Sequence, residues 1–258
     1  MRRDLARSPE LVRRLLAREL RGEYRQTLFG GLLAFLPALG LVLWAVLADR
    51  ARLIATGDLE VPYPAWVLAG TVLWHTFAES IQAQLEALLA ERGTLAKLDL
   101  PPEGPILAAV GRVVIHLLPK LVLLAVVFAI FDVPLSVGQL LAPLPIFGLI
   151  AFGTALGLVL APLNALYRDV GKTLQPILTL WMLLTPVFYP VPRMGALATL
   201  LTWNPVTPLL GAARDLLTGG APATPWAAVA IAVAALLALP CAWFFYRLAL
   251  PTILERTV

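Results

Sequence analysis

The sequence predicts an all-α integral membrane protein with six transmembrane helices, an N-terminal amphipathic interface helix and a re-entrant helix pair between spans five and six. Of its 258 residues, 60% are hydrophobic and only 14% are charged, whereas soluble domains are about half apolar and a quarter charged. Apolar runs of about 20 residues, enough to cross a bilayer, recur along the chain. The arginines gather before the first run and in alternate loops, as positive-inside topology expects, so the formal net charge of +4 does not indicate a nucleic-acid partner.

Residues 8–25 predict an amphipathic helix at the membrane surface. Ser8 is a suitable N-cap, and Pro9 suits the first helical position. The leucines of this segment fall on one side of the helix, and the other side carries Arg14, Arg18 and Arg21. Two interpretations are open, because such a helix can anchor the chain to anionic lipids or dock a partner protein.

The first two spans are expected at 28–47 and 62–83, with the N-terminus in the cytoplasm and the loop between them outside. Polar side chains recur every three or four residues along the second span and share one helix face: Thr71, His75, Glu79, Gln82 and Glu86. Polar groups at membrane depth usually face a bundle interior or a water-filled path. The alternative is that Glu79 and Gln82 lie at the cytoplasmic interface.

A cytoplasmic segment at 91–101 follows the second span and ends in a run of prolines, which terminates any helix there. A short helix in this position is a plausible docking element for a soluble partner, although any cytoplasmic loop would also be charged.

The third span, expected at 112–131, carries Arg112, His116 and Lys120 at i, i+4 and i+8, so the three share one face. They either snorkel to the interface or form a basic inner vestibule that attracts an anionic substrate head. Glu79 is expected at a similar depth and could pair with Arg112 or His116.

The fourth span, expected at 140–163, contains Gly153 and Gly157, a small-xxx-small pattern that permits close helix packing. A short cytoplasmic turn follows it, formed by Tyr167, Arg168 and Asp169.

The fifth and sixth spans are expected at 173–190 and 226–250, with the C-terminus in the cytoplasm. The region 194–217 between them has two apolar pieces of about ten residues each, too short to cross a hydrocarbon core. Prolines stand where the pieces meet, so we expect a re-entrant pair on the external side, where protein or water satisfies the irregular backbone.

Catalytic chemistry is not indicated by the polar residues. Gly171-Lys172-Thr173 resembles the end of a P-loop, but Leu166 stands where the pattern requires glycine. With Cys241 as the single cysteine and only two histidines, we expect no metal site. The chain is therefore expected not to be an enzyme and to bind no cofactor, with transport energy supplied by a partner subunit or an ion gradient.

Several motifs occur in an order and spacing that resemble one family, namely Arg18–Arg25, Val61–Pro64, Leu68–Trp74, Leu163–Val170, Thr185–Pro190 and Trp203–Pro205. On these residues the chain resembles the membrane (permease) subunit of ABC-2 type polysaccharide exporters, which move O-antigen, capsule or teichoic acid. Lys97 with Leu100-Pro101 is similar to that family's coupling segment. Leu100, however, stands where the family usually has an aromatic residue before the proline, and Pro102-Glu103 stand where it has a basic residue after it.

The resemblance implies one ABC-2 type membrane domain over residues 1–258, in the bacterial inner membrane. Two copies would form a channel above two ATP-binding cassette subunits, and those subunits would hold ATP and magnesium. The substrate implied is a lipid-linked polysaccharide, O-antigen-like first, with capsule or teichoic acid next.

The residues expected to function fall into three groups. Contacts to the ATPases are expected from Arg14, Arg18, Arg21, Arg92, Leu95, Lys97 and Leu100. A substrate path is expected along Arg112, His116, Lys120, His75 and Glu79, with the aromatic residues Tyr63, Trp66, Trp74 and Phe77, unless these rings belong to the interfacial aromatic belt. An external gate is expected from Phe188, Tyr189, Trp203, Asn204, Pro205 and Arg214.

Other functions are open at this point. An ABC-2 exporter of a small hydrophobic compound has the same architecture. A secondary transporter driven by protons through His75, Glu79 and His116 is a different class, although the chain shows no visible internal repeat. A membrane polymerase or transferase would need paired acidic residues on a cytoplasmic loop, for which Asp99 and Glu103 are poor candidates.

Overall fold

The computed structural model describes residues 12–13, 16–17, 36–51, 59, 61–97, 102–167, 169–190, 201 and 203–255. All regular secondary structure within these ranges is helical, which confirms the predicted all-α class. The principal helices are α3 (Leu36–Arg50), α4 (Tyr63–Lys97), α5 (Glu103–Ile130), η1 (Val137–Leu141), α6 (Pro143–Leu166), α7 (Asp169–Leu183), α9 (Val206–Leu217) and α10 (Pro225–Glu255).

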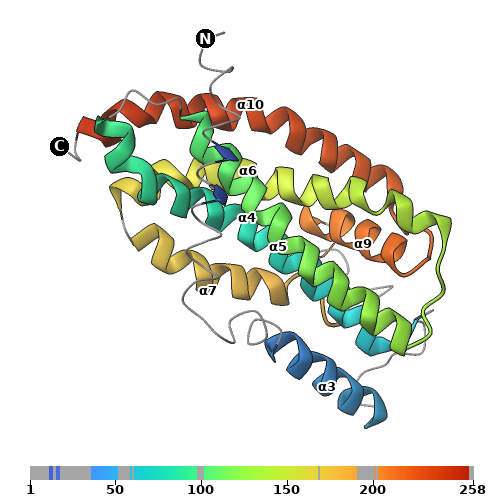
Figure 1. The fold of residues 1–258 in the computed structure, drawn as a ribbon. Helices are drawn as coiled ribbons and strands as arrows, with labels where there is room; N and C mark the ends of the chain where they lie inside the picture. Colours follow the sequence, from blue (N-terminus) through green and yellow to red (C-terminus); the bar gives the residue numbers. More distant parts are fainter. Residues whose placement is uncertain are drawn as a thin grey trace.

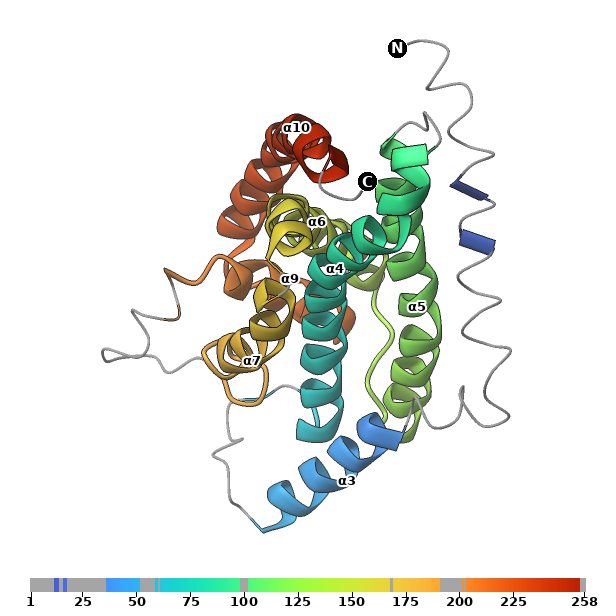
Figure 2. The same ribbon diagram turned by 90° about the vertical axis from the view of Figure 1, so that its left-hand side faces the viewer.

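The long helices pack side by side in the order α10, α6, α4, α5 (Figure 1). The short helix α9 contacts α4, α6 and α10, and α7 contacts α4 and α6. Seen from the side, α4 stands between α7 and α5, with α3 across its first turns (Figure 2). Helix α4 is therefore the element that both flanking helices share.

Three of the described helices are long and apolar enough to cross a membrane: α5, the η1–α6 unit and α10. They coincide with the predicted third, fourth and sixth spans, and they place the protein in a membrane. Helix α3 covers residues 36–47 of the predicted span 28–47 and continues to Arg50, and residues 28–35 lie outside the described part of the chain. Helices α4 and α7 lie where spans two and five were expected, but α4 is interrupted by polar residues and α7 has only 15 residues.

Helix α4 is longer than the predicted span 62–83. Its 35 residues correspond to about 52 Å, against a hydrocarbon core of about 30 Å. The helix continues because the sequence from Leu85 to Ala90 is rich in leucine, alanine and glutamate, which favour helix. Residues 91–97 of the predicted coupling segment thus belong to α4, and residues 98–101 lie outside the described part of the chain.

Two predicted boundaries shift. Helix α5 begins at Glu103 rather than near Arg112, because Pro102 and Pro105 fit a first helical turn. Helix α7 ends at Leu183, short of the expected end at 190, and turns follow through Val187. Pro186 cannot continue the hydrogen-bonding pattern of a helix, and it disfavours helical backbone at Thr185 before it.

The contact between α4 and α6 depends on two glycines. A Cβ atom at Gly153 would lie 2.7 Å from the carbonyl oxygen of Phe77, and one at Gly157 would lie 2.6 Å from that of Ile81. Both distances are below van der Waals contact with backbone atoms. The close packing predicted from the Gly153–Gly157 spacing is thereby confirmed.

Helix α9 supplies the second half of the predicted region 194–217. Its 12 residues extend about 18 Å, too short to span a membrane. Val206, Leu209, Leu210 and Ala213 are buried against the neighbouring helices. The first half of the expected re-entrant pair falls mostly on residues outside those described, so the pair as a whole stays a prediction.

Candidate functional site

Helix α4 stands between α5 and α7 (Figure 2), and its polar side chains bond to both: Glu79 and Glu86 to α5, and Gln82 to α7. We call His75, Glu79, Gln82 and Glu86 the α4 polar band. His75 and Glu86 are exposed, and Glu79 and Gln82 are half-buried. Thr71, which shares the spacing, is buried and donates to the carbonyl of Val67 at 2.8 Å. The band therefore starts one turn later than the sequence pattern.

Helix α5 faces this band with its three basic residues. Glu79 lies 2.5 Å from Nδ1 of His116 and accepts a hydrogen bond from Nζ of Lys120 at 2.6 Å. Arg112 donates to Glu86 at 2.8 Å. Of the two partners expected for Glu79, His116 is the one it meets, together with Lys120, and Arg112 pairs with Glu86 instead.

The basic face of α5 is largely paired with carboxylates rather than free to attract an anion. Arg112, His116 and Lys120 do share one face of α5, but two carboxylates of α4 neutralise much of their charge. Ion pairs of this kind reduce the cost of holding charges at membrane depth. They also leave less positive potential to attract an anionic substrate than an unpaired basic face would. A role of these residues in the substrate path stays a prediction.

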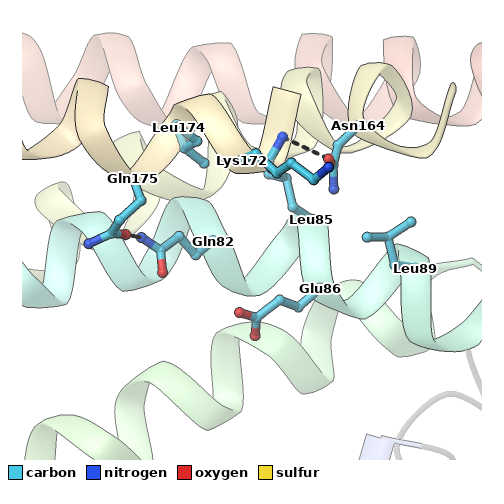
Figure 3. Close-up of a pocket in the computed structure, with 9 residues that line it drawn as sticks. Gln82, Leu85, Glu86, Leu89, Asn164, Lys172, Leu174 and Gln175 are labelled. Carbon is cyan, nitrogen blue, oxygen red and sulfur yellow. Dashed lines mark hydrogen bonds between the residues drawn. The ribbon is translucent and has the colours of Figure 1, made fainter. Parts of the chain in front are cut away.

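On its other side the band meets α7. Gln82 donates through Nε2 to Oε1 of Gln175 at 2.5 Å. A groove of about 500 Å³ opens beside this contact, between α4, the end of α6 and the start of α7 (Figure 3). We call it the inner groove; its lining residues are Gln82, Leu85, Glu86, Leu89, Asn164, Gly171, Lys172, Leu174 and Gln175.

Sequence reasoning did not assign the α7 side of this groove. Lys172, Gln175 and Thr179 are all exposed, and their spacing of three and four residues puts them on one helical face. This spacing could have predicted a polar face on α7. The apolar residues around it instead favoured a transmembrane span.

The turn between α6 and α7 is held by a buried amide. Asn164 accepts a hydrogen bond at Oδ1 from the backbone N–H of Gly171 at 2.8 Å. A Cβ atom at position 171 would lie 2.6 Å from that oxygen, so a larger residue there would displace the Asn164 amide. Of the predicted turn residues, Tyr167 is exposed, Asp169 begins α7, and Arg168 lies outside the described residues.

The aromatic residues expected along a path are buried within the chain. Phe77 stacks on Phe152 at 5.7 Å between ring centroids, and both Phe77 and Trp74 contact Trp181 edge-on at 5.4 and 6.1 Å. Tyr63 and Trp66 are also buried. In this arrangement the four aromatic residues expected along the path pack the interior of the chain. A substrate reaches their rings only if the helices separate.

Two of the residues expected to form an external gate, Phe188 and Arg214, contact the first turns of α4. Arg214 of α9 is almost fully buried, with Cζ 3.6 Å from the ring centroid of Trp66. Its Nη1 donates to the carbonyl oxygen of Pro186 at 2.8 Å. Tyr63 donates to the carbonyl of Phe188 at 2.7 Å. We call this meeting of α4, α9 and the turn after α7 the outer junction.

Asn204 completes the outer junction. Its Oδ1 accepts hydrogen bonds from Nε1 of Trp181 and from the backbone N–H of Val206, both at 3.1 Å, and its Nδ2 donates to Oγ1 of Thr185 at 2.8 Å. One side chain thus bonds to the first residue of α9 and joins it to the end of α7. Pro205 follows at the start of α9, Tyr189 bonds back to Leu183, and Trp203 is exposed.

The residues expected to couple to ATPases are described only in part. Arg92 is half-buried and Leu95 is buried near the end of α4. Lys97 ends that helix, but its side chain is outside the description. Arg14, Arg18, Arg21 and Leu100 lie outside the described residues, so their role stays a prediction.

Comparison with known proteins identifies a family and a curated relative. The family described as ABC-2 type transporter matches residues 10–218. The relative is the O-antigen export system permease protein RfbA of Myxococcus xanthus. It is 26% identical over 217 residues, which cover 81% of this chain and 80% of the relative.

Proposed function

The chain belongs to the ABC-2 type transporter family, and from this premise we propose that it is the membrane subunit of an ATP-driven exporter of a lipid-linked polysaccharide. The cargo is O-antigen-like first, with capsule polymer or teichoic acid next. Two copies form the channel in the bacterial inner membrane, with both termini in the cytoplasm. Each copy works with one of two ATP-binding cassette subunits, which hold ATP and magnesium.

The observation that carries this proposal is the α4 polar band between α5 and α7. Two members of the band, His75 and Glu79, fall within the first 20 or so residues of α4, which are enough to cross a hydrocarbon core. Polar and charged groups at that depth are stable only where they face water or other protein. A second copy that placed its own band opposite would enclose a polar path, which a glycan with many hydroxyl groups requires. The name of the relative, which is an O-antigen export permease, supports a glycan cargo.

The length of α4 supports a cytoplasmic partner. If the first 20 or so residues of α4 cross the hydrocarbon core, the helix leaves it near Gln82. Arg92 then stands about 15 Å beyond that boundary. A soluble ATPase subunit can contact this extension, and motion there is transmitted along one continuous helix to the polar band.

Reconstitution with the partner tests the function. The chain is purified with the proposed ATP-binding subunit and placed in lipid nanodiscs, and ATP hydrolysis is measured with added ligands. Lipid-linked glycan is expected to stimulate hydrolysis, whereas the unlinked glycan is not. Stimulation by small hydrophobic compounds alone would favour the drug-export alternative. Transport driven by a proton gradient without ATP would favour secondary transport through His75, Glu79 and His116.

A further inference from the structure

The inner groove lies at the level of the lipid headgroups in the proposed topology. The first 20 or so residues of α4, from Tyr63, are enough to cross a hydrocarbon core. The groove residues of α4 come next, from Gln82 to Leu89, and the first two turns of α7 lie beside them (Figure 3). A ligand in the groove would therefore have its head at the membrane interface.

The lining of the groove suits an amphiphile with a hydrogen-bonding head. Leu85, Leu89 and Leu174 supply apolar surface. Gln82 and Gln175 are joined by one hydrogen bond, which leaves a carbonyl oxygen at one end of the pair and an NH₂ group at the other. The amide of Asn164 adds a further donor at the wall. The volume of about 500 Å³ is within the range of small-molecule sites, about 300 to 1,000 Å³.

The cation best placed to meet an anion here is Lys172. Its carboxylate neighbour Asp169 lies 3.9 Å away, and the two side chains are 78% and 92% exposed, so that pair is weak. The basic residues of α5, in contrast, contact Glu79 and Glu86 at 2.8 Å or less. Glu86 also lines the groove, but Arg112 is bonded to it.

We infer that the inner groove binds the phosphate-bearing sugar end of the lipid-linked polysaccharide before transport. Lys172 binds a phosphate oxygen, the amides of Gln82, Asn164 and Gln175 hold hydroxyl groups of the first sugar, and the leucines contact the start of the lipid. This inference rests on the proposed function and names the part of the substrate that the chain recognises. The Gly171-Lys172-Thr173 segment thus meets phosphate without being a nucleotide-binding loop.

A binding measurement on the complex of the chain with its ATP-binding subunit tests the groove. The probe is radiolabelled farnesyl diphosphate–N-acetylglucosamine, a short lipid-linked sugar, bound to complexes in phosphatidylcholine nanodiscs. Lys172→Gln is expected to weaken binding by about tenfold or more, because a charge-assisted hydrogen bond is lost. Lys172→Arg should retain most of the affinity, and Gln175→Leu should weaken binding by a smaller factor.

The matched control is Arg247→Gln, which removes one positive charge from α10, outside the groove. Arg247 is 43% exposed and lies 3.6 Å from Glu103. The control should bind the probe as the wild type does. Equal loss of affinity in Lys172→Gln and Arg247→Gln would show a general charge effect and overturn the inference, as would unchanged binding by Lys172→Gln.

Two further measurements complete the test. The first distinguishes the phosphate of a lipid-linked sugar from that of an ordinary anionic lipid, and the second distinguishes failure of the groove assignment from failure of the proposed export function. If phosphatidylglycerol added to the nanodiscs displaces the probe as well as unlabelled glycolipid does, the groove is a site for ordinary anionic lipid and the inference is wrong. If the complex exports lipid-linked glycan while Lys172→Gln binds and exports normally, only the groove assignment fails. If the wild-type complex neither binds nor exports lipid-linked glycan, the proposed function itself fails.

Discussion

Arg214 carries a charge into the outer junction with only 5% of its surface exposed. Two contacts offset the loss of water: the face of Trp66 and the carbonyl oxygen of Pro186. A guanidinium can make both at once because it is planar and has several donors in fixed directions. Arg214 thereby holds α9 against both α4 and the turn that follows α7.

Replacing Arg214 with glutamine should destabilise the protein measurably. The buried carbonyl of Pro186 would lose its partner, which costs about 1 to 3 kcal/mol, and the contact with Trp66 would be lost as well. Arg247→Gln is the control, because Arg247 also lies over a tryptophan, Trp243 at 5.1 Å, but is partly exposed. Its effect should stay within about 0.5 kcal/mol. Thermal unfolding of the detergent-purified protein measures both, and equal shifts in midpoint temperature would contradict the structural role of Arg214.

Spacing along single helices predicted which residues share a face, but not which partner each one meets. The sequence left two partners open for Glu79, namely Arg112 and His116, and the structure selects His116. Arg112 was matched less well, because α5 begins at Glu103 and its axial offset from α4 places Arg112 beside Glu86. Such offsets depend on the tertiary packing of two helices, and no local pattern specifies them.

In helices α4 and α7, the length of the apolar run in the sequence does not predict where the helix ends. An apolar run of spanning length was expected to end α4 near residue 83, but helix-favouring residues carry it to Lys97. In α7 the apolar composition continues past Leu183, whereas the helix does not, because Pro186 prevents its continuation. Several residues of the outer junction were predicted to form an external gate, but the contacts between them were not predicted. The hydrogen bonds of the junction join segments far apart in sequence, such as Tyr63 and Phe188, and could not be read from spacing.

The close approach of α4 and α6 gives a prediction at the level of these two helices. Gly157→Ala should destabilise the protein by about 1 to 3 kcal/mol, because the added methyl group meets the backbone oxygen of Ile81 and the helices must separate. Gly211→Ala in α9 is the control, since a Cβ atom there has open space. It should be neutral or slightly stabilising, as alanine favours helix more than glycine does. Thermal melting with size-exclusion chromatography measures both, and Gly157→Ala melting at or above the wild type would refute the contact.

At the scale of the whole molecule, the chain presents two kinds of surface. The outer face of α10 is apolar along its length, and its exposed residues include Trp226, Val229, Val233, Leu237, Phe244 and Leu248. Such a surface suits lipid tails. The exposed residues of α4 and α7 include polar side chains instead: His75 and Glu86 on α4, and Gln175 and Thr179 on α7. The protein therefore has one side for lipid and another for water or a second copy.

Thiol labelling in membranes distinguishes these two sides. Cys241 is exposed on α10 and is first replaced by serine, so that a single new cysteine reports its own surroundings. Thr179→Cys should react with a charged, water-soluble methanethiosulfonate reagent, because the proposed path brings water to α7. Leu237→Cys on α10 should be spared by that reagent, since a thiol in apolar surroundings keeps its proton and reacts poorly. A membrane-permeable maleimide, applied after solubilisation, confirms that both thiols are intact. If Thr179→Cys in the membrane is spared as Leu237→Cys is, the polar face is not hydrated, and the α4 polar band does not line a path for a glycan.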